Sequence, residues 1–440
     1  RVDISGTTFS IPDLRIKQSP AQAHMKTEST ITAALSLLDA PPFRFLTKAG
    51  QPVTLADGRA RLNGDLNFLL KDKLTPEEVA CEAEGGLRDV RSETLVDGRV
   101  LTASVLEVAA SNERIQIGGQ ARIGAVPLSG DWSMALGPNT GGESRVLGQI
   151  ELSERFVDEF EIGLPPGSLS GAGWGEIEIG FGKGNPGQFA LTSDLAGIGL
   201  RIPQLGWALS QGGTGRLDVT GQLGRPDQPP RLDGLSLNAA GLRATGSVTI
   251  NPQGGLARAD FTSVEIGDWL NAPVSLIGRG PGATPRIEVA GGQVDLRQTS
   301  LMGEGGGAGD GGPVTLRLDR LQVSDTLALT QFRGNLNTAR GTKGSFTGQL
   351  NGITPISGDV VPMQGRSAFR IRSDDAGRVL AAAGLLKQAR DGTMELILTP
   401  APEPGSYDGV LAIQQLRVRE APALAALLNT ISVVGLLEQF

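Results

Sequence analysis

Four carboxylates stand close together in the sequence, at Glu154, Asp158, Glu159 and Glu161. Paired carboxylates hydrolyse glycosides by acid–base chemistry or bind calcium. Helical spacing, however, places positions 154, 158 and 161 on one side of a helix, and charge runs of this kind usually form a solvated face. The pattern therefore favours a solvated helix over a catalytic or calcium site.

Other reactive side chains are scarce. His24 and Cys81 are the only histidine and cysteine. A hydroxyl nucleophile needs a neighbouring base, and zinc needs clustered cysteines and histidines. The glycine-rich stretches 171–175 and 182–184 lack the spacing of nucleotide-binding loops. We predict a solvated His24, and a protein that is not an enzyme and has no metal or cofactor.

Composition narrows the choice of fold and partner. The 440 residues include 63 Gly and 26 Pro but only 4% aromatic residues, so turn formers are abundant and the apolar surface is aliphatic. The 40 Lys and Arg residues are dispersed among 47 Asp and Glu residues. Because a phosphate backbone requires clustered basic residues, we expect no nucleic acid partner.

Apolar and polar residues alternate in short, glycine-punctuated runs from about residue 58 to 420. This period of two is typical of strands with one apolar and one polar face. We predict a mostly β protein, an elongated, twisted antiparallel β-sheet curled into an open groove (a repeating β-groove) with a few short α-helices. The predicted apolar lining is Ile177, Ile179, Val248, Ile250, Ile287, Val289, Val314, Leu316, Leu318, Leu327, Leu329, Met394, Leu396 and Leu398.

Helical spacing is confined to a few segments, which are 30–38, 153–160, 375–389 and 421–437. We divide the predicted groove into a first segment, 1–152, with its short helix near 30–39, a central segment, 153–374, and a last segment, 375–440, with a helix, closing strands and a C-terminal amphipathic helix. All three are predicted to be parts of one continuous groove. The run Gly303–Gly312 is predicted to be a flexible loop.

The few helices supply too little apolar surface to cover so many strands. Our leading prediction is that lipid hydrocarbon occupies the apolar face. A structural or adhesive β-sandwich of the cell envelope without a ligand is the alternative. A third hypothesis is a carbohydrate-active enzyme on a β-scaffold, but its sugar platform would need aromatic rings, and Trp132, Trp174, Trp207 and Trp269 are scattered.

Several stretches resemble a known family. They are Thr32–Pro42 with Lys48–Gly50, Leu74–Val79, Glu84–Val90, Asp408–Val410, Leu416–Val418, and Glu420–Asn429 with Ile431–Leu437. They resemble the AsmA-like envelope proteins of Gram-negative bacteria, of the YhdP and TamB type. The resemblance implies a bridge-like lipid transfer protein of the periplasm that conducts phospholipids between the inner and outer membranes. It also implies an inner-membrane anchor through an N-terminal helix missing here, and a possible outer-membrane contact. We accordingly expect this chain, which begins at Arg1, to be a section of a longer protein.

Overall fold

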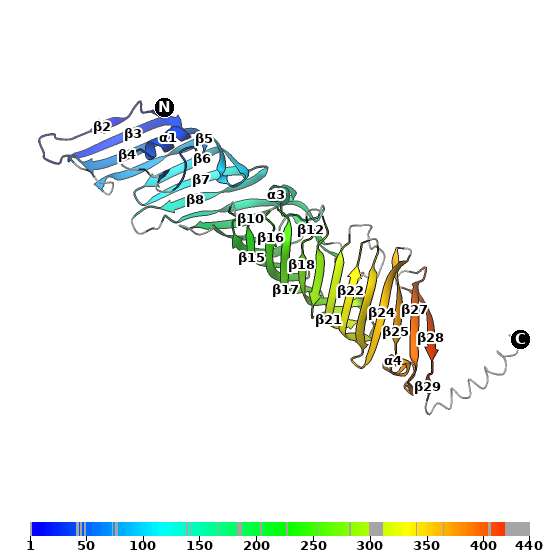
Figure 1. Ribbon diagram of the computed structural model, residues 1–440. Coiled ribbons are helices and arrows are strands. Elements are labelled where there is room, and N and C mark those ends of the chain that lie inside the picture. Colours follow the sequence, from blue (N-terminus) through cyan, green and yellow to red (C-terminus); the bar gives the residue numbers. More distant parts are fainter. Residues whose placement is uncertain are drawn as a thin grey trace, which may run out of the picture. The chain divides into compact units, whose positions relative to one another are not determined.

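The protein is mostly β, with 63% of residues in strands and 7% in helices (Figure 1). The computed structural model describes residues 2–418 except 41–43, 45, 48–49, 73, 75–77, 138–139, 141, 166, 183–186, 203–204, 226–227, 253, 281–282, 299–310, 340, 364 and 404–405. Its strands form a large, mainly antiparallel sheet accompanied by short helices. The predicted fold class is therefore confirmed.

Internal contacts divide the chain into two compact units. Unit 1 comprises Arg1–Arg201, Ala208–Ala240 and Val248–Gly255, and unit 2 comprises Ile202–Trp207, Gly241–Ser247 and Leu256–Phe440. The strand β16 (Leu242–Ile250) is divided between them, and the end residues Ile202 of β12 (Ile198–Ile202) and Trp207 of β13 (Trp207–Leu209) belong to unit 2. The three groove segments predicted from the sequence stay a prediction.

Unit 1 is built mainly from hairpins of consecutive strands. Its strands are β1 (Val2–Asp3), β2 (Thr8–Ser10), β3 (Pro20–Thr30), β4 (Asp57–Leu69), β5 (Ala80–Val96), β6 (Arg99–Ser111), β7 (Arg114–Ile123), β8 (Val126–Ala135), β9 (Ser144–Ser153), β10 (Leu169–Phe181), β11 (Gln188–Ser193), β12 (Ile198–Ile202), β13 (Trp207–Leu209), β14 (Gly215–Gln222) and β15 (Arg231–Ala239). Strands β3 to β10 pair in order, and the sheet continues through β11, β14 and β15. Tight turns make this possible. Gly98, for example, has a φ of +69° between the paired residues Val96 and Arg99.

Unit 2 repeats the antiparallel pattern with one interruption. Its strands are β17 (Leu256–Ile266), β18 (Leu270–Ile277), β19 (Arg286–Ala290), β20 (Gln293–Asp295), β21 (Pro313–Gln322), β22 (Ala328–Asn337), β23 (Lys343–Leu350), β24 (Thr354–Met363), β25 (Arg366–Ser373), β26 (Ala389–Arg390), β27 (Thr393–Pro400), β28 (Tyr407–Gln414) and β29 (Arg417–Val418). Strands β19 and β20 pair in parallel with successive parts of β21. The other edge of β21 pairs with β22, where the antiparallel order resumes. β26 and β29 form a separate small sheet.

The helices partly match their predicted positions. Helix α1 (Ile31–Leu38) is capped by Thr30, whose Oγ1 accepts a hydrogen bond from the Ala33 N–H at 3.2 Å. Helix α3 (Glu154–Glu159) follows Ser153, but the Ser153 side chain makes no capping hydrogen bond. A 3-10 turn, η3, spans Leu296–Gln298.

The predicted helix 375–389 is too long at its C-terminal end. Helix α4 (Ala376–Ala382) is capped by Asp375 and stops just before Gly384, which has a φ of +74°. A left-handed glycine ends a helix by redirecting the chain, and the residues that follow lead into β26. Residues 303–310 of the predicted flexible loop and the predicted helix 421–437 lie outside the described residues.

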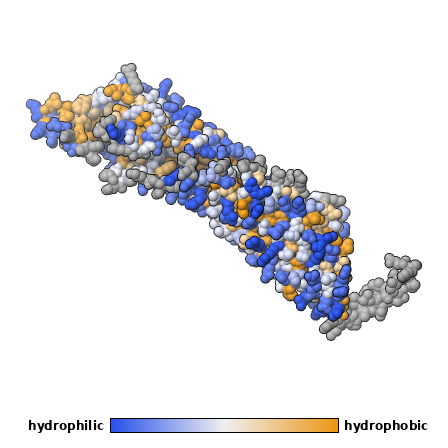
Figure 2. All heavy atoms as spheres, in the orientation of Figure 1, coloured by the Kyte–Doolittle hydropathy of each residue, from blue (hydrophilic) through white to orange (hydrophobic). Residues whose placement is uncertain are grey.

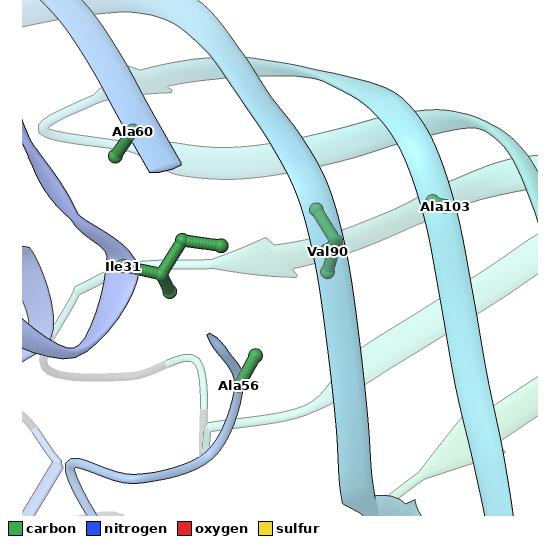
Figure 3. Close-up of a cluster of buried hydrophobic side chains, with 5 residues drawn as sticks. All are labelled: Ile31, Ala56, Ala60, Val90 and Ala103. Carbon is green, nitrogen blue, oxygen red and sulfur yellow. The ribbon is translucent and has the colours of Figure 1, made fainter. Parts of the chain in front are cut away.

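A small core in unit 1 shows how a helix covers the apolar face of the sheet. Ile31 of α1 is buried with Ala56, Ala60, Val90 and Ala103 (Figure 3). The helix residues Ala34 and Leu35, together with the strand residues Leu87 and Leu106, pack around this cluster. Helix α1 thus covers the apolar face over β4 to β6, where the sheet supplies small side chains.

Candidate functional site

Strand register gathers the apolar residues of unit 1 into rows. Directly opposed residues of neighbouring strands project from the same face of a sheet. One row, called row 1, crosses nine strands at Leu87, Leu106, Gly119, Gly130, Gly148, Ile177, Leu191, Val219 and Leu235. Row 1 contains no charged or polar side chain, so it is an unbroken apolar line across unit 1.

Unit 2 contains a corresponding line. Row 2 crosses nine strands at Val274, Val289, Leu316, Gly334, Phe346, Gly358, Ile371, Leu396 and Leu411. The adjacent row on the same face includes Leu276, Ile287, Val314 and Leu336. Within each unit the predicted gathering of aliphatic residues on one face is therefore present.

The predicted lining residues fall into these rows in groups. Ile177 belongs to row 1, and Ile179 lies two residues along the same strand, opposite Phe189. Val289, Leu316 and Leu396 belong to row 2. Ile287 and Val314 pair with each other in the next row, and Leu398 opposes Phe369.

The remaining predicted residues are less regular. Leu318 opposes Phe332, and Met394 lies between Ser373 and Ile413. Leu327 was predicted to line the apolar face, but it lies in the turn before β22 (Ala328–Asn337). Its carbonyl accepts hydrogen bonds from the N–H groups of Val323 and Ser324 there. Val248 and Ile250 lie in β16.

Burial distinguishes a filled core from an accessible face. Val289, Leu318, Leu329 and Met394 are buried, and the other ten predicted lining residues are half-buried. Half-burial of this kind is what an apolar face shows when its own chain covers it incompletely. These side chains retain accessible apolar area that a ligand would cover.

The predicted lining does not include the three glycines of row 1, where the apolar face carries no side chain. Gly119, Gly130 and Gly148 are adjacent in row 1, so three neighbouring strands present no side chain there. A Cβ atom built on Gly130 would lie 2.7 Å from the Cα of Gly148. Gly119 is exposed, and Gly130 and Gly148 are half-buried. A signal existed, since each glycine occupies an apolar-face position in its strand, but a pattern search counts only side chains.

The glycines of row 2 lie in a different environment. A Cβ atom on Gly358 would approach Cζ of Phe346 to 2.3 Å, and one on Gly334 would lie 3.2 Å from the Phe332 ring. These two rings stack with centroids 5.7 Å apart. Gly334 and Gly358 are consequently buried, because aromatic side chains of the same unit fill the space above them.

An open pocket of about 690 Å³ lies at one end of unit 1. It is lined by apolar residues such as Pro12, Pro20 and Phe68 and by polar ones such as Asn67 and Glu78. Figure 2 shows an apolar patch over this β2 to β4 region. The exposed apolar residues there include Phe9, Leu14, Ile16 and Leu69. This end of unit 1 therefore leaves apolar surface uncovered.

Charged residues pair with one another on the opposite face. Arg145 and Glu178 lie 2.7 Å apart, and Arg258 and Asp260 lie 2.6 Å apart. The hydrogen bond from Arg258 holds the pKa of Asp260 below its usual range. On the apolar side, Cys81 opposes Leu66, and burial raises the pKa of its thiol. Charge is thus kept away from the apolar rows.

The candidate catalytic residues do not form a recognisable reactive group. Nδ1 of His24 lies 3.0 Å from a carboxylate oxygen of Asp65, and both side chains are nearly half exposed. Glu154 and Asp158 are exposed on α3, and Glu161 is exposed just after it. Among the described residues, no group of three His, Cys, Asp or Glu side chains is arranged to hold a metal ion. Within the same residues, no helix has the length and apolar character needed to span a membrane.

Comparison with known proteins adds no relative. The chain matches no protein-family model, no curated protein and no solved structure.

Proposed function

We propose that this protein binds lipid hydrocarbon chains on its apolar faces and conducts phospholipids as a section of a bridge-like lipid transport protein. The observation that carries the proposal is the accessible glycine stretch of row 1, flanked by Leu106 on one side and Ile177 on the other. A glycine stretch among aliphatic side chains presents backbone and no side chain on the apolar face. A hydrocarbon chain fits such a surface because neither partner offers a hydrogen bond.

The free-energy cost of exposing lipid chains to water explains why a continuous apolar surface could conduct phospholipids. A two-chain lipid carries about 30 methylene groups, and exposing each to water costs about 0.8 kcal/mol, or about 24 kcal/mol in all. Rows that lack charged groups would remove much of this barrier. They would also allow chains to slide, because they present no fixed polar contact.

The sequence resemblance extends the proposal to a cellular setting. As an AsmA-like protein, the chain would work in the periplasm of a Gram-negative bacterium and pass phospholipids between inner and outer membranes. No catalytic step is required, since the transferred lipid is chemically unchanged.

The alternative is a structural or adhesive β-protein of the cell envelope whose apolar faces are filled by its own side chains. The stacked rings of Phe332 and Phe346 favour this alternative locally, because they fill the glycine gaps of row 2. The two proposals therefore differ most clearly in what they expect at row 1.

Lipid content of the purified protein tests the proposal. Mass spectrometry of protein extracted from bacterial cells should detect bound phospholipid. Ile177→Lys places a charge beside Gly148 and should reduce the bound phospholipid several-fold. Gln149→Lys is the matched control, because Gln149 is exposed on the neighbouring strand and belongs to the opposite face. Lipid-free wild-type protein, or equal loss in both variants, would contradict the proposal.

A further inference from the structure

A polar pocket of about 570 Å³ lies within unit 2. Strand register brings its main residues together, because Glu265, Asn271, Gln293 and Arg320 oppose one another in turn across β17, β18, β20 and β21. Pockets of this size hold small organic ligands. Four adjacent strands thus present polar side chains to one place.

The polar side chains of the pocket lie on the face opposite row 2. Ile266, Leu270, Val294 and Leu321 alternate with these four polar residues and oppose one another on the other face of the sheet. Leu270 and Val294 also contribute to the pocket lining. Leu270 and Leu321 are buried, which fixes the sheet beneath the pocket. A ligand bound here would be separated by the sheet from hydrocarbon on row 2.

One wall of the pocket is an ion-pair network. Arg297 donates to Asp295 through Nε at 2.9 Å and Nη2 at 2.5 Å, and to Asp325 through Nη1 at 2.5 Å. The first of these contacts holds the pKa of Asp295 below its usual range. The two-pronged contact with the largely buried Asp295 orients the Arg297 guanidinium at this wall.

Arg320 is positioned differently. Its Nε and Nη2 donate to Oε1 of Gln322 at 2.9 and 2.7 Å, and the Gln322 amide donates in turn to the Ser324 carbonyl. No carboxylate in the described part of the chain forms an ion pair with Arg320. Its Nη1 side therefore offers oriented donors without a competing anion.

Trp269 supplies an aromatic surface at the pocket. It lies in the turn between β17 and β18, where its backbone N–H donates to the Ile266 carbonyl at 3.2 Å. Its own carbonyl accepts from the Asp295 N–H at 2.7 Å. The side chain is half-buried and lines the pocket. These two hydrogen bonds fix the backbone that carries the ring.

We infer that this pocket binds a saccharide. Its lining balances Arg243, Arg297 and Arg320 against Glu265, Asp268 and Asp295, so it has no strong preference for an anion or a cation. Amide groups donate and accept hydrogen bonds, carboxylates accept them and guanidinium groups donate them, so together these side chains can satisfy the hydroxyl groups of a sugar. A tryptophan ring covers the apolar C–H face of a sugar. The site is independent of the proposed lipid function.

The test uses the whole chain and three soluble probes: maltotriose, cellotriose and N,N′-diacetylchitobiose. Saturation-transfer NMR at millimolar sugar should show binding of at least one probe. Trp269→Ala should abolish the transfer, and Gln293→Ala should weaken binding about tenfold. Trp174→Ala, at an exposed tryptophan of unit 1, is the matched control and should bind as the wild type does.

The outcomes separate clearly. Absence of transfer from all three sugars overturns the inference, as does binding of inorganic phosphate in their place or equal binding by Gln293→Ala and the wild type. Gln293 is exposed on the face opposite row 2, so Gln293→Ala should fold as the wild type does. The test therefore remains valid even if Trp269→Ala fails to fold. Bound phospholipid should be unchanged in Gln293→Ala, so failure here does not bear on the lipid proposal.

Discussion

Rows 1 and 2 each consist of apolar residues and glycines across nine strands, but the surroundings of their glycines differ. In row 1 the nearest atoms to a Cβ built on Gly130 or Gly148 belong to the backbone of the neighbouring strand. In row 2 the nearest atoms to a Cβ built on Gly358 belong to the Phe346 ring. The first set of glycines is accessible, and the second is buried.

The comparison teaches that glycine in a strand has two opposite uses. Where only the backbone of the neighbouring strand lies against the glycines, as at Gly130 and Gly148, the face carries no side chain there and an external ligand can occupy the space. Where a phenylalanine lies beside it, the same glycine accommodates the ring and the face becomes a filled core. The rings, and not the glycines, therefore decide whether an apolar face is available.

The largest effect is expected from removing a ring of row 2. Phe346→Ala should destabilise unit 2 by about 3–5 kcal/mol, since it deletes a buried aromatic side chain and leaves a cavity. Urea unfolding measures this loss, and Phe9→Ala, at an exposed phenylalanine, should change stability by less than about 0.5 kcal/mol.

The same variant should make row 2 resemble row 1. If ring filling is what closes row 2, a fluorescent phospholipid analogue should bind Phe346→Ala more than the wild type under conditions where both are folded. Unchanged binding by the folded variant would show that ring filling does not distinguish the two rows.

An intermediate effect is expected from filling row 1. Gly130→Ala places a Cβ 2.5 Å from the Leu147 carbonyl oxygen and should cost about 1–3 kcal/mol of unfolding free energy through overpacking. Gly180→Ala is the matched control, because a Cβ there meets nothing within 4 Å. Equal unfolding midpoints for the two variants in urea would contradict the close strand approach in row 1.

The smallest effect concerns a carboxylate of unit 1 on the face opposite row 1. Arg155 donates to Glu151 at 2.7 and 2.6 Å and holds the pKa of that carboxyl below its usual range. The folded pKa is therefore lower than the unfolded one. The stabilisation is present above about pH 4.3 and is lost as the pH falls through the folded value.

Glu151→Gln should lower stability at pH 7 by less than about 1 kcal/mol and should reduce the loss of stability on acidification. The exposed Glu154→Gln is the control and should leave the pH profile of thermal unfolding unchanged. If Glu151→Gln kept the pH dependence of the wild type, the ion pair between Glu151 and Arg155 would not contribute to the loss of stability on acidification. Phospholipid content should not follow these changes, because Glu151 is not on the apolar face.

Much of the fold could be predicted from particular residues. The alternation around Ile177 and Ile179, and that from Val314 to Leu318, correctly indicated strands with one apolar face, because a period of two separates the two sides of any strand. Thr30 and Asp375 marked helix starts for a similarly local reason. The end of α4 was misplaced because apolar spacing continued past Gly384, whose backbone conformation overrides that spacing.

The candidate site was less predictable. The predicted lining omits Leu191, Val219 and Ile371, although they complete rows 1 and 2. A row depends on which residues oppose one another across strands, and the sequence alone does not show this. The polar pocket was missed for the same reason. Trp269 is far from the other tryptophans in the sequence, yet its relevant neighbours in the pocket are Gln293 and Arg320, which belong to β20 and β21.

The sequence by itself determined that the chain forms strands, that each strand has an aliphatic side, and that charged residues fall on the other side. These properties depend on residues near one another in the chain. Only the tertiary structure decided which strands are neighbours, where glycines align, and which of them a phenylalanine ring covers. Register between strands is set by pairing over long sequence separations, and a shift of one residue would transfer every side chain to the opposite face.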